Sequence, residues 1–143
     1  MVDLRKEPLR LDVVTPEARA LSLSCDEVRA PGTGGGFGVR PGHTPFITSL
    51  ATGVLTVVAG GREVDYAIDG GFCEVAENRV TVLADFVEPA AGIDLAAALR
   101  EHDAAVERLR AIKAQDGVAF RREAALVRRA AARVAASRNH SGH

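Results

Sequence analysis

The chain has 143 residues, of which 47% are hydrophobic and 26% are charged, and its formal net charge is −1. This length fits one domain or a small domain with an appendage, and the hydrophobic content argues against disorder of the whole chain. Uninterrupted apolar runs of about eighteen residues are absent, which excludes a helix that crosses a bilayer. The N-terminus lacks an apolar stretch, which predicts no secretory signal.

Charge is divided unevenly along the chain. Residues 1–93 carry 8 basic and 13 acidic side chains, whereas residues 94–143 carry 10 basic and 6 acidic side chains. Such a split predicts two structural units with different partners. We place these units at residues 1–90 and residues 91–143.

The first unit is typical of an antiparallel β-sandwich. Short segments rich in Val, Ile, Leu and Phe alternate with turn residues at a spacing of roughly 8–12 residues. Residues 59–62 and 77–78 predict tight hairpin turns, and Pro89 stops the last strand. The predicted strands lie at residues 9–14, 28–30, 37–39, 53–59, 64–68, 71–76 and 80–86.

Within this unit, the segment 32–45 is rich in Gly and Pro. Such residues beside strands predict turns of specified geometry, and therefore an exposed, shaped surface. A phosphate-binding loop is excluded, because the Lys-Ser/Thr pair that ends such a loop is missing and a strand follows. His43 is either a contact at a subunit interface or a loop histidine bonded to the backbone. Catalysis is disfavoured, because no carboxylate or nucleophile stands at a recognisable spacing from it.

The second unit predicts two amphipathic helices joined as an antiparallel hairpin. Asp94 is a natural N-cap for the first helix, and Gly117 is expected to end it in a left-handed turn. Alanine is frequent in both helices, so the hairpin should bury little area and be weakly held. Residues 139–143 are expected to be frayed. The predicted apolar stripes are Leu95, Leu99, His102, Val106 and Leu109, then Phe120, Ala124, Val127, Ala131 and Val134.

The second helix carries a basic face. Arg122, Arg129 and Arg133 share this face, because they are spaced by seven and four residues. A solvated surface is one interpretation, and recognition of carboxylate or phosphate is the other, since arginine rather than lysine is used throughout. Nucleic acid is disfavoured by the slightly acidic chain and the lack of interleaved aromatic residues. The arginines of this helix are Arg121, Arg122, Arg128, Arg129, Arg133 and Arg138.

Two cysteines, Cys25 and Cys73, lie in separate strand-like segments. The sequence alone leaves open whether these two cysteines form a disulfide. A chain without a leader predicts a reducing cytosol, however, so we expect two free, buried thiols.

Three segments resemble the epsilon subunit of bacterial F-type ATP synthase. They are GVRPGHTP at residues 38–45, GGFCEV at residues 70–75 and VTVLAD at residues 80–85. The LDVVTP at residues 11–16 is similar to the first strand of that family, and the resemblance covers about residues 9–138. It implies a sandwich that binds the gamma subunit and the ring of c subunits. It also implies a hairpin that lies compact or extends along gamma, where its basic helix meets the beta subunits and inhibits ATP hydrolysis.

The same resemblance implies particular site residues. The gamma and c-ring interface would include Gly36, Phe37, Arg40, Pro41, Gly42, His43 and Pro45. Inhibitory contacts with the beta subunits would come from Arg121, Arg122, Arg128, Arg129 and Arg133. No metal ligand or catalytic residue is implied.

ATP is a regulatory ligand of some members of this family, bound through an Ile-Asp-x-x-Arg-Ala motif and arginines of the second helix. Here Asp94 and Ala98 match the motif, but Ala97 stands in place of its arginine. Asp94, Arg122, Arg129 and Arg133 remain as candidate nucleotide contacts. The incomplete motif predicts weak or absent ATP binding, and no other cofactor is expected.

We therefore predict a non-catalytic rotor subunit of a proton-translocating F-type ATP synthase, with gamma, the c-ring and alpha/beta as partners and no nucleic acid. It would couple c-ring rotation to gamma and regulate hydrolysis through its hairpin. It would be peripheral, held at the cytoplasmic face of the bacterial inner membrane only through the complex. The alternative is a free-standing ligand-binding β-sandwich with a helical tail, which the few aromatic residues disfavour. An enzyme ranks third, because no catalytic constellation can be assembled.

Overall fold

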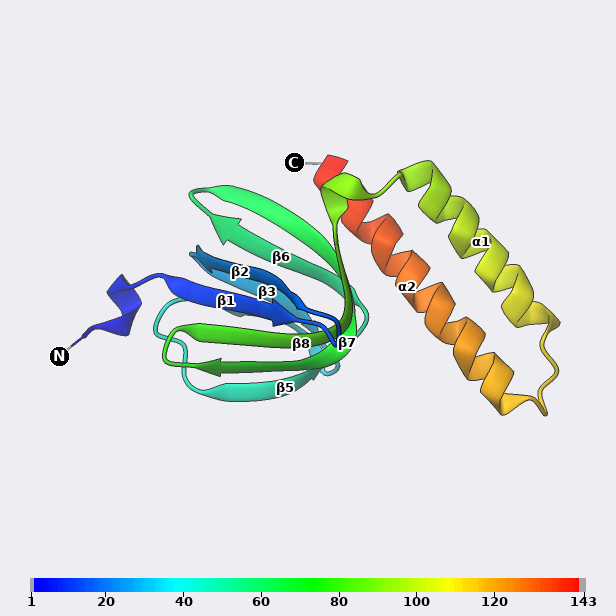
Figure 1. The fold of residues 1–143 in the computed structure, drawn as a ribbon, viewed down its shortest axis with the longest axis horizontal. Helices are drawn as coiled ribbons and strands as arrows, with labels where there is room; N and C mark the ends of the chain where they lie inside the picture. Colours follow the sequence, from blue (N-terminus) through cyan, green and yellow to red (C-terminus); the bar gives the residue numbers. More distant parts are fainter. Residues whose placement is uncertain (1, 142–143) are drawn as a thin grey trace.

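The computed structural model describes residues 2–141 and shows a β-sandwich with two antiparallel helices at one end (Figure 1). The predicted fold class is therefore confirmed. The helices are α1 (Leu95–Ala111) and α2 (Gly117–Ser141), and two short 3-10 helices, η1 (Leu4–Lys6) and η2 (Ala90–Gly92), precede β1 and α1. The strands are β1 (Leu9–Val14), β2 (Arg19–Cys25), β3 (Glu27–Gly32), β4 (Gly35–Val39), β5 (Phe46–Leu50), β6 (Gly53–Ala59), β7 (Arg62–Ala76) and β8 (Arg79–Pro89).

Hydrogen bonds connect the strands in the order β2-β1-β8-β7-β5-β3-β4, and β6 pairs with both β3 and β7. The pairs are antiparallel except for β1 and β8, which run parallel. The long strand β7 joins the two layers, because its first half pairs with β6 and its second half with β5. Gly71 lies between these halves at φ +140°, and a Cβ there would stand 1.7 Å from the carbonyl oxygen of Leu83. Only glycine fits this position.

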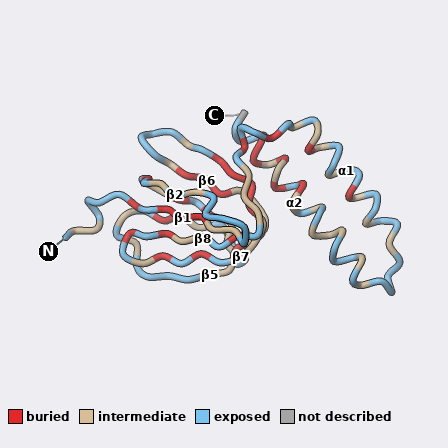
Figure 2. Tube along the Cα trace, in the orientation of Figure 1, coloured by how far each residue is buried: buried red, intermediate tan, exposed pale blue. Residues whose placement is uncertain are grey.

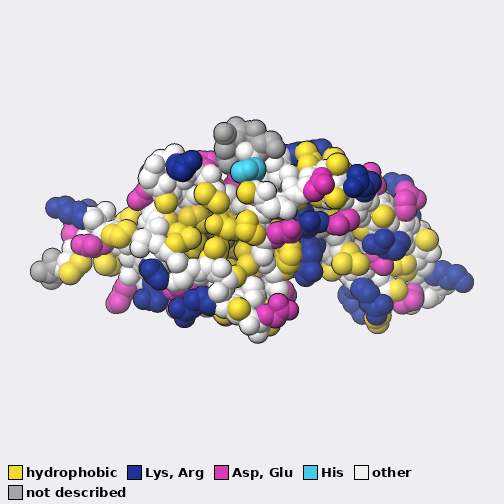
Figure 3. All heavy atoms as spheres, turned by 45° about the horizontal axis from the view of Figure 1, so that its top comes forward, with side chains coloured by type: hydrophobic (Ala, Val, Ile, Leu, Met, Phe, Trp, Pro, Cys, Tyr) yellow, Lys and Arg dark blue, Asp and Glu magenta, His cyan; other side chains and the backbone are white. Residues whose placement is uncertain are grey.

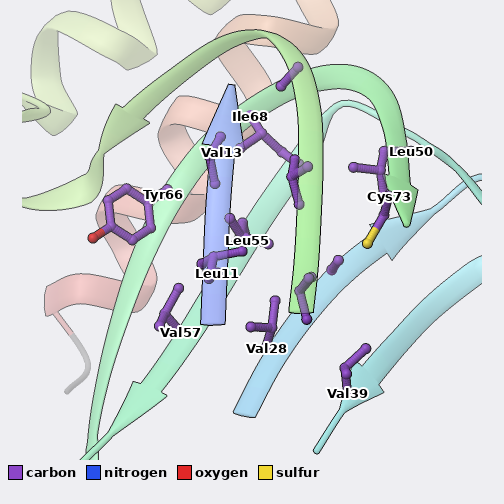
Figure 4. Close-up of a cluster of buried hydrophobic side chains, with 14 of the residues drawn as sticks. Leu11, Val13, Val28, Val39, Leu50, Leu55, Val57, Tyr66, Ile68 and Cys73 are labelled. Atoms are coloured by element: carbon purple, nitrogen blue, oxygen red, sulfur yellow. The ribbon is translucent and has the colours of Figure 1, made fainter. Parts of the chain in front are cut away.

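The main hydrophobic core fills the sandwich. Leu11, Val28, Leu55 and Ile68 come from different strands and are fully buried (Figure 4). Burial of such aliphatic side chains is the main force that stabilises the fold. Buried residues are frequent in the sandwich strands and in the C-terminal half of α2, whereas the far end of the hairpin is mostly exposed (Figure 2).

The predicted strands are present, but with three differences. Two strands, β2 and β5, were not predicted. Residues 64–68 and 71–76 belong to the single strand β7, because Gly70 and Gly71 bend the strand without ending it. Both predicted turns are confirmed, and Asn78 in the second turn has φ +61°.

The hairpin confirms some expectations and corrects others. Asp94 caps α1, since its carboxylate accepts a hydrogen bond from the amide of Ala97 at 3.2 Å. The prediction for Gly117 was wrong: α1 ends at Ala111, and Gly117 begins α2, with Asp116 accepting from the amide of Ala119. The prediction of a frayed tail was also wrong for residues 139–141, because α2 continues to Ser141. Residues 142–143 lie outside the described part of the chain.

The apolar stripe predicted for α2 was partly wrong. Phe120 is 48% exposed and Ala131 is exposed, whereas Val134 is buried as expected. The buried residues of α2 are Ala130, Ala132, Val134, Ala136 and Ser137. Because α2 packs against both α1 and the sandwich, its buried surface is wider than a single stripe. The proposed boundary at residue 90 stays a prediction; β8 ends at Pro89 and α1 begins at Leu95.

Candidate functional site

The loop that follows β4 is held in a fixed shape at the end of the sandwich remote from the hairpin (Figure 1). Gly42 has φ +86°, and its amide donates a hydrogen bond of 2.8 Å to Oδ1 of Asn78. The Asn78 amide nitrogen in turn donates to the carbonyl oxygens of Leu4 at 2.6 Å and Glu7 at 3.2 Å. One buried side chain therefore ties together η1, the β7–β8 turn and this loop.

The segment 32–45 is not one loop, because β4 runs through it. Gly36 and Phe37 lie within β4, whereas Arg40, Pro41, His43 and Pro45 follow that strand. The glycine-rich part is the β3–β4 hairpin and not a phosphate loop. Gly36, Arg40, Gly42 and Pro45 are exposed, and Phe37, Pro41 and His43 are half-buried.

His43 has the environment of a loop histidine with an aromatic neighbour. Its Nδ1 donates to the carbonyl oxygen of Thr44 at 2.7 Å, because a carbonyl can only accept. The rings of His43 and Phe46 lie 5.9 Å apart, and those of Phe46 and Phe37 lie 5.3 Å apart, both edge to face. Arg40 forms an ion pair of 3.2 Å with Glu27. The arrangement offers a shaped contact surface and no group that activates a nucleophile.

An apolar cluster that sequence reasoning missed lies on the outer face of the sandwich. Ile47 of β5, Phe72 of β7 and Leu83 of β8 are 68%, 56% and 49% exposed. Phe72 and Leu83 are paired directly across the two strands. Their neighbours Cys73 and Val82 point into the core. Side chains alternate between the two faces of a strand, so the residue next to a core residue faces outward. This alternation is the signal that could have placed the cluster on the outer face. We call Ile47, Phe72 and Leu83 the outer apolar patch.

At the other end of the sandwich, Arg129 of α2 contacts β7 and β8. Its Nη2 and Nε donate to Oδ2 of Asp69 at 2.6 and 3.1 Å, and its guanidinium lies 4.7 Å from the centre of the Phe86 ring. Thr52 donates to the other oxygen of Asp69 at 2.7 Å. Burial alone would raise the pKa of the Asp69 carboxyl, but these hydrogen bonds, with the charges of Arg129 and Arg128, lower it overall.

Arg133 joins three elements. Its Nε donates to Glu88 of β8 at 2.8 Å, its Nη2 donates to the other oxygen of Glu88 at 3.3 Å, and its Nη1 pairs with Glu101 of α1. The hydrogen bond to Glu88 raises the pKa of the guanidinium despite partial burial. Charged side chains of both signs accordingly gather where the sandwich meets the hairpin (Figure 3).

The predicted arginine set is therefore divided. Arg129 and Arg133 pack against the sandwich, whereas Arg121, Arg122 and Arg128 are exposed. Arg122 belongs to the N-terminal half of α2. This half of the helix projects away from the sandwich (Figure 1).

Three of the four candidate nucleotide contacts have partners within this chain. Asp94 caps α1, and Arg129 and Arg133 already face carboxylates. Within residues 2–141, no group of three or more His, Cys, Asp or Glu residues could hold a metal ion. In the same range, no helix is long and apolar enough to cross a membrane.

A β-sandwich with exposed contact surfaces and a helical hairpin packed at one end defines a protein of the docking class. Comparison with known proteins identifies its family. The family model described as "ATP synthase, Delta/Epsilon chain, beta-sandwich domain" matches residues 8–90. An ATP synthase epsilon chain of Anaeromyxobacter sp. (strain Fw109-5) is 56% identical over 88% of this chain and 95% of that protein. The epsilon chain of Myxococcus xanthus (strain DK1622) is 46% identical over 90% of this chain and 94% of its own length. The chain therefore belongs to the ATP synthase delta/epsilon family.

A solved structure shows the same fold. A chain of the Euglena gracilis mitochondrial ATP synthase assembly OSCP/F1/c-ring superposes with a TM-score of 0.74 at 19% identity, covering 95% of this chain and 82% of the other. As an epsilon chain, the protein is a structural stalk subunit of ATP synthase and not a catalytic one. Of the functions expected from the sequence, this favours the stalk subunit over a free-standing ligand-binding sandwich.

Proposed function

We propose that the sandwich docks onto the gamma subunit and the c-ring, and that the hairpin regulates ATP hydrolysis by the catalytic subunits. The outer apolar patch carries the docking part of this proposal. Exposed apolar side chains on one face of a rigid sheet are typical of a protein–protein interface, because their exposure to water is unfavourable until a partner covers them. We assign gamma as the partner of this patch.

The loop at residues 40–45 supplies a second contact, toward the c-ring. It lies at the end of the sandwich opposite the hairpin, and Asn78 holds it in one shape. A fixed loop loses little conformational entropy on binding. With the loop at one end and the hairpin at the other, the same subunit can contact the ring and the catalytic head.

The hairpin is the regulatory element in this proposal. Arg121, Arg122 and Arg128 of α2 are exposed, and exposed arginines suit an acidic surface of the beta subunits. The relatives are bacterial ATP synthase subunits. We accordingly propose a peripheral position at the cytoplasmic face of the inner membrane, in a complex that translocates protons.

Co-purification with gamma tests the docking surface. Phe72→Glu places a charge in the centre of the outer apolar patch and should weaken the complex by about 30-fold or more, the effect of losing an interface hot spot. Val64→Glu is a matched control, because Val64 lies on the same strand, is 47% exposed and is remote from the patch. Equal recovery of gamma with both variants would show that this patch is not the docking surface.

A further inference from the structure

A nearly buried carboxylate lies on the outer face of the sandwich. Leu11 and Val13 of β1 are buried in the core, so Asp12 between them points outward. The Asp12 side chain is nevertheless only 7% exposed. Ser22 of β2 donates a hydrogen bond to its Oδ1 at 2.7 Å, and Nη1 of Arg79 of β8 donates to its Oδ2 at 3.3 Å. One carboxylate therefore connects three neighbouring strands.

This carboxylate is surrounded by more positive charge than it can neutralise. Arg10 of β1 donates a hydrogen bond to the Ser22 hydroxyl, and Arg19 of β2 lies near enough for its charge to act on Asp12. The hydrogen bond from Ser22, together with the charges of the three arginines, lowers the pKa of the Asp12 carboxyl despite desolvation. Asp12 is therefore ionised at neutral pH. We call Arg10, Arg19 and Arg79 the arginine cluster.

The arginine cluster has donors to spare for an external group. Arg10 and Arg79 are register neighbours across β1 and β8, where like charges repel each other. All three arginines are exposed. A guanidinium has five N–H donors, and the bonds to Ser22 and Asp12 use one donor of Arg10 and one of Arg79. An incoming carboxylate would relieve the repulsion and accept hydrogen bonds from the free donors.

The arginine cluster adjoins the outer apolar patch. Leu83 of the patch is the register partner of Val14 in β1, and Val14 is the register partner of Arg19 in β2. Arg79 and Leu83 are four residues apart on β8, so alternation places them on the same face. A partner that covers the patch therefore also reaches the arginines.

Alternation also places two acidic residues, Glu74 and Asp85, on this face. Glu74 of β7 and Asp12 both pair with Thr81, from opposite sides of β8, so Glu74 lies across that strand from the cluster. Asp85 lies beyond Leu83 along β8. The positive charge is therefore concentrated on the β1–β2 side of the apolar patch.

We propose that the arginine cluster, held in place by Asp12, is a recognition site for an acidic segment of the partner that covers the outer apolar patch. This inference deepens the proposed docking function, and gamma as the partner rests on it. The apolar patch supplies affinity through burial. The arginines attract the acidic segment at a distance and orient it on arrival, which mainly raises the association rate.

Association kinetics between gamma and the full-length chain test this site. Arg10→Gln combined with Arg19→Gln removes two charges and keeps the bond between Arg79 and Asp12. At about 50 mM salt, its association rate constant should be about fivefold or more below that of the native chain. At about 0.5 M salt the two rates should converge, because salt screens exposed charges.

A matched control separates the site from a general effect of charge. Arg62→Gln combined with Lys113→Gln changes the net charge equally at two exposed positions, in the β6–β7 hairpin and in the loop between the helices. This variant should associate at nearly the native rate. Urea denaturation gives a second readout: the midpoint of Arg10→Gln/Arg19→Gln should stay at or above the native one, because repulsion is relieved.

The outcomes distinguish this site from the docking surface itself. A native association rate and salt dependence in Arg10→Gln/Arg19→Gln, or an equal loss in the control, would overturn the recognition site. A clear fall in the urea midpoint would assign the arginines to the fold instead. A slowed, salt-insensitive association of Arg10→Gln/Arg19→Gln, combined with full recovery of gamma by Phe72→Glu, would refute the apolar docking surface and leave the arginine site standing.

Discussion

Asn78 provides the sharpest test of how the docking loop is held. The residue is 7% exposed, has φ +61°, and makes hydrogen bonds with the backbone of Leu4, Glu7 and Gly42. Asn78→Ala removes all three bonds, which costs about 1 kcal/mol each. Alanine in the left-handed conformation adds about 1 kcal/mol. We therefore expect the free energy of unfolding to fall by about 4 kcal/mol, a large share of the stability of an ordinary domain.

Two further variants divide this effect into its causes. Asn78→Gly tolerates the backbone angle but loses the same bonds, so it should cost about 3 kcal/mol. Glu77→Ala is the control, because Glu77 is the preceding turn residue, also has positive φ and is exposed. It should change stability by less than about 0.5 kcal/mol. Urea denaturation followed by circular dichroism gives the three values. A loss below about 1 kcal/mol for Asn78→Ala would mean that the hydrogen bonds to Asn78 do not hold the loop.

Three other predictions concern the loop, the hairpin and the thiols. Gly42→Glu should lower the recovery of the c-ring in co-purification, because φ at Gly42 is +86° and a Cβ there would stand 2.5 Å from Cγ of Arg5. Full recovery of the c-ring with a folded variant would argue against the loop as a contact. Calorimetry should detect no ATP binding at micromolar concentration, because Ala97 cannot make the charged contact that the motif's arginine supplies. That contact is worth roughly ten- to a hundredfold in affinity. A clear low-micromolar isotherm would refute this prediction. Cys25 and Cys73 should react with a thiol reagent at pH 8 only after unfolding, since burial raises the pKa of each thiol to about 11; rapid reaction of the native chain would contradict that burial.

The sequence correctly predicted the caps and turns that are determined by neighbouring residues. Asp94 was predicted as an N-cap and the Asn78 turn as a hairpin turn, because each depends on residues adjacent in the chain. Strands β2 and β5 were missed. These two strands are about as rich in apolar residues as the central ones, but only Cys25 of β2 and Leu50 of β5 are buried.

Contacts between residues that are far apart in the chain could not be predicted from local sequence patterns. The basic face of α2 indicated carboxylate partners, but Asp69 and Glu88 lie 60 and 45 residues from the arginines that bind them. Nothing in the local sequence says that these partners belong to the same chain. The alanine-rich stripe of α2 likewise has little contrast between its faces, which is why Phe120 was placed inside.

The regulatory role of the hairpin is the central claim, and the rate of ATP hydrolysis tests it most directly. The rate would be measured for reconstituted ATP synthase that carries the full-length chain, the chain truncated after Ala91, or a variant with the exposed Arg121, Arg122 and Arg128 changed to Ala. Alanine has the highest helix propensity, so this variant should keep its helix. The account predicts that truncation and the triple change each raise hydrolysis by roughly tenfold or more, with assembly intact, because charged interface contacts to the catalytic subunits are lost. Equal rates in all three complexes would show that the hairpin is not an inhibitor.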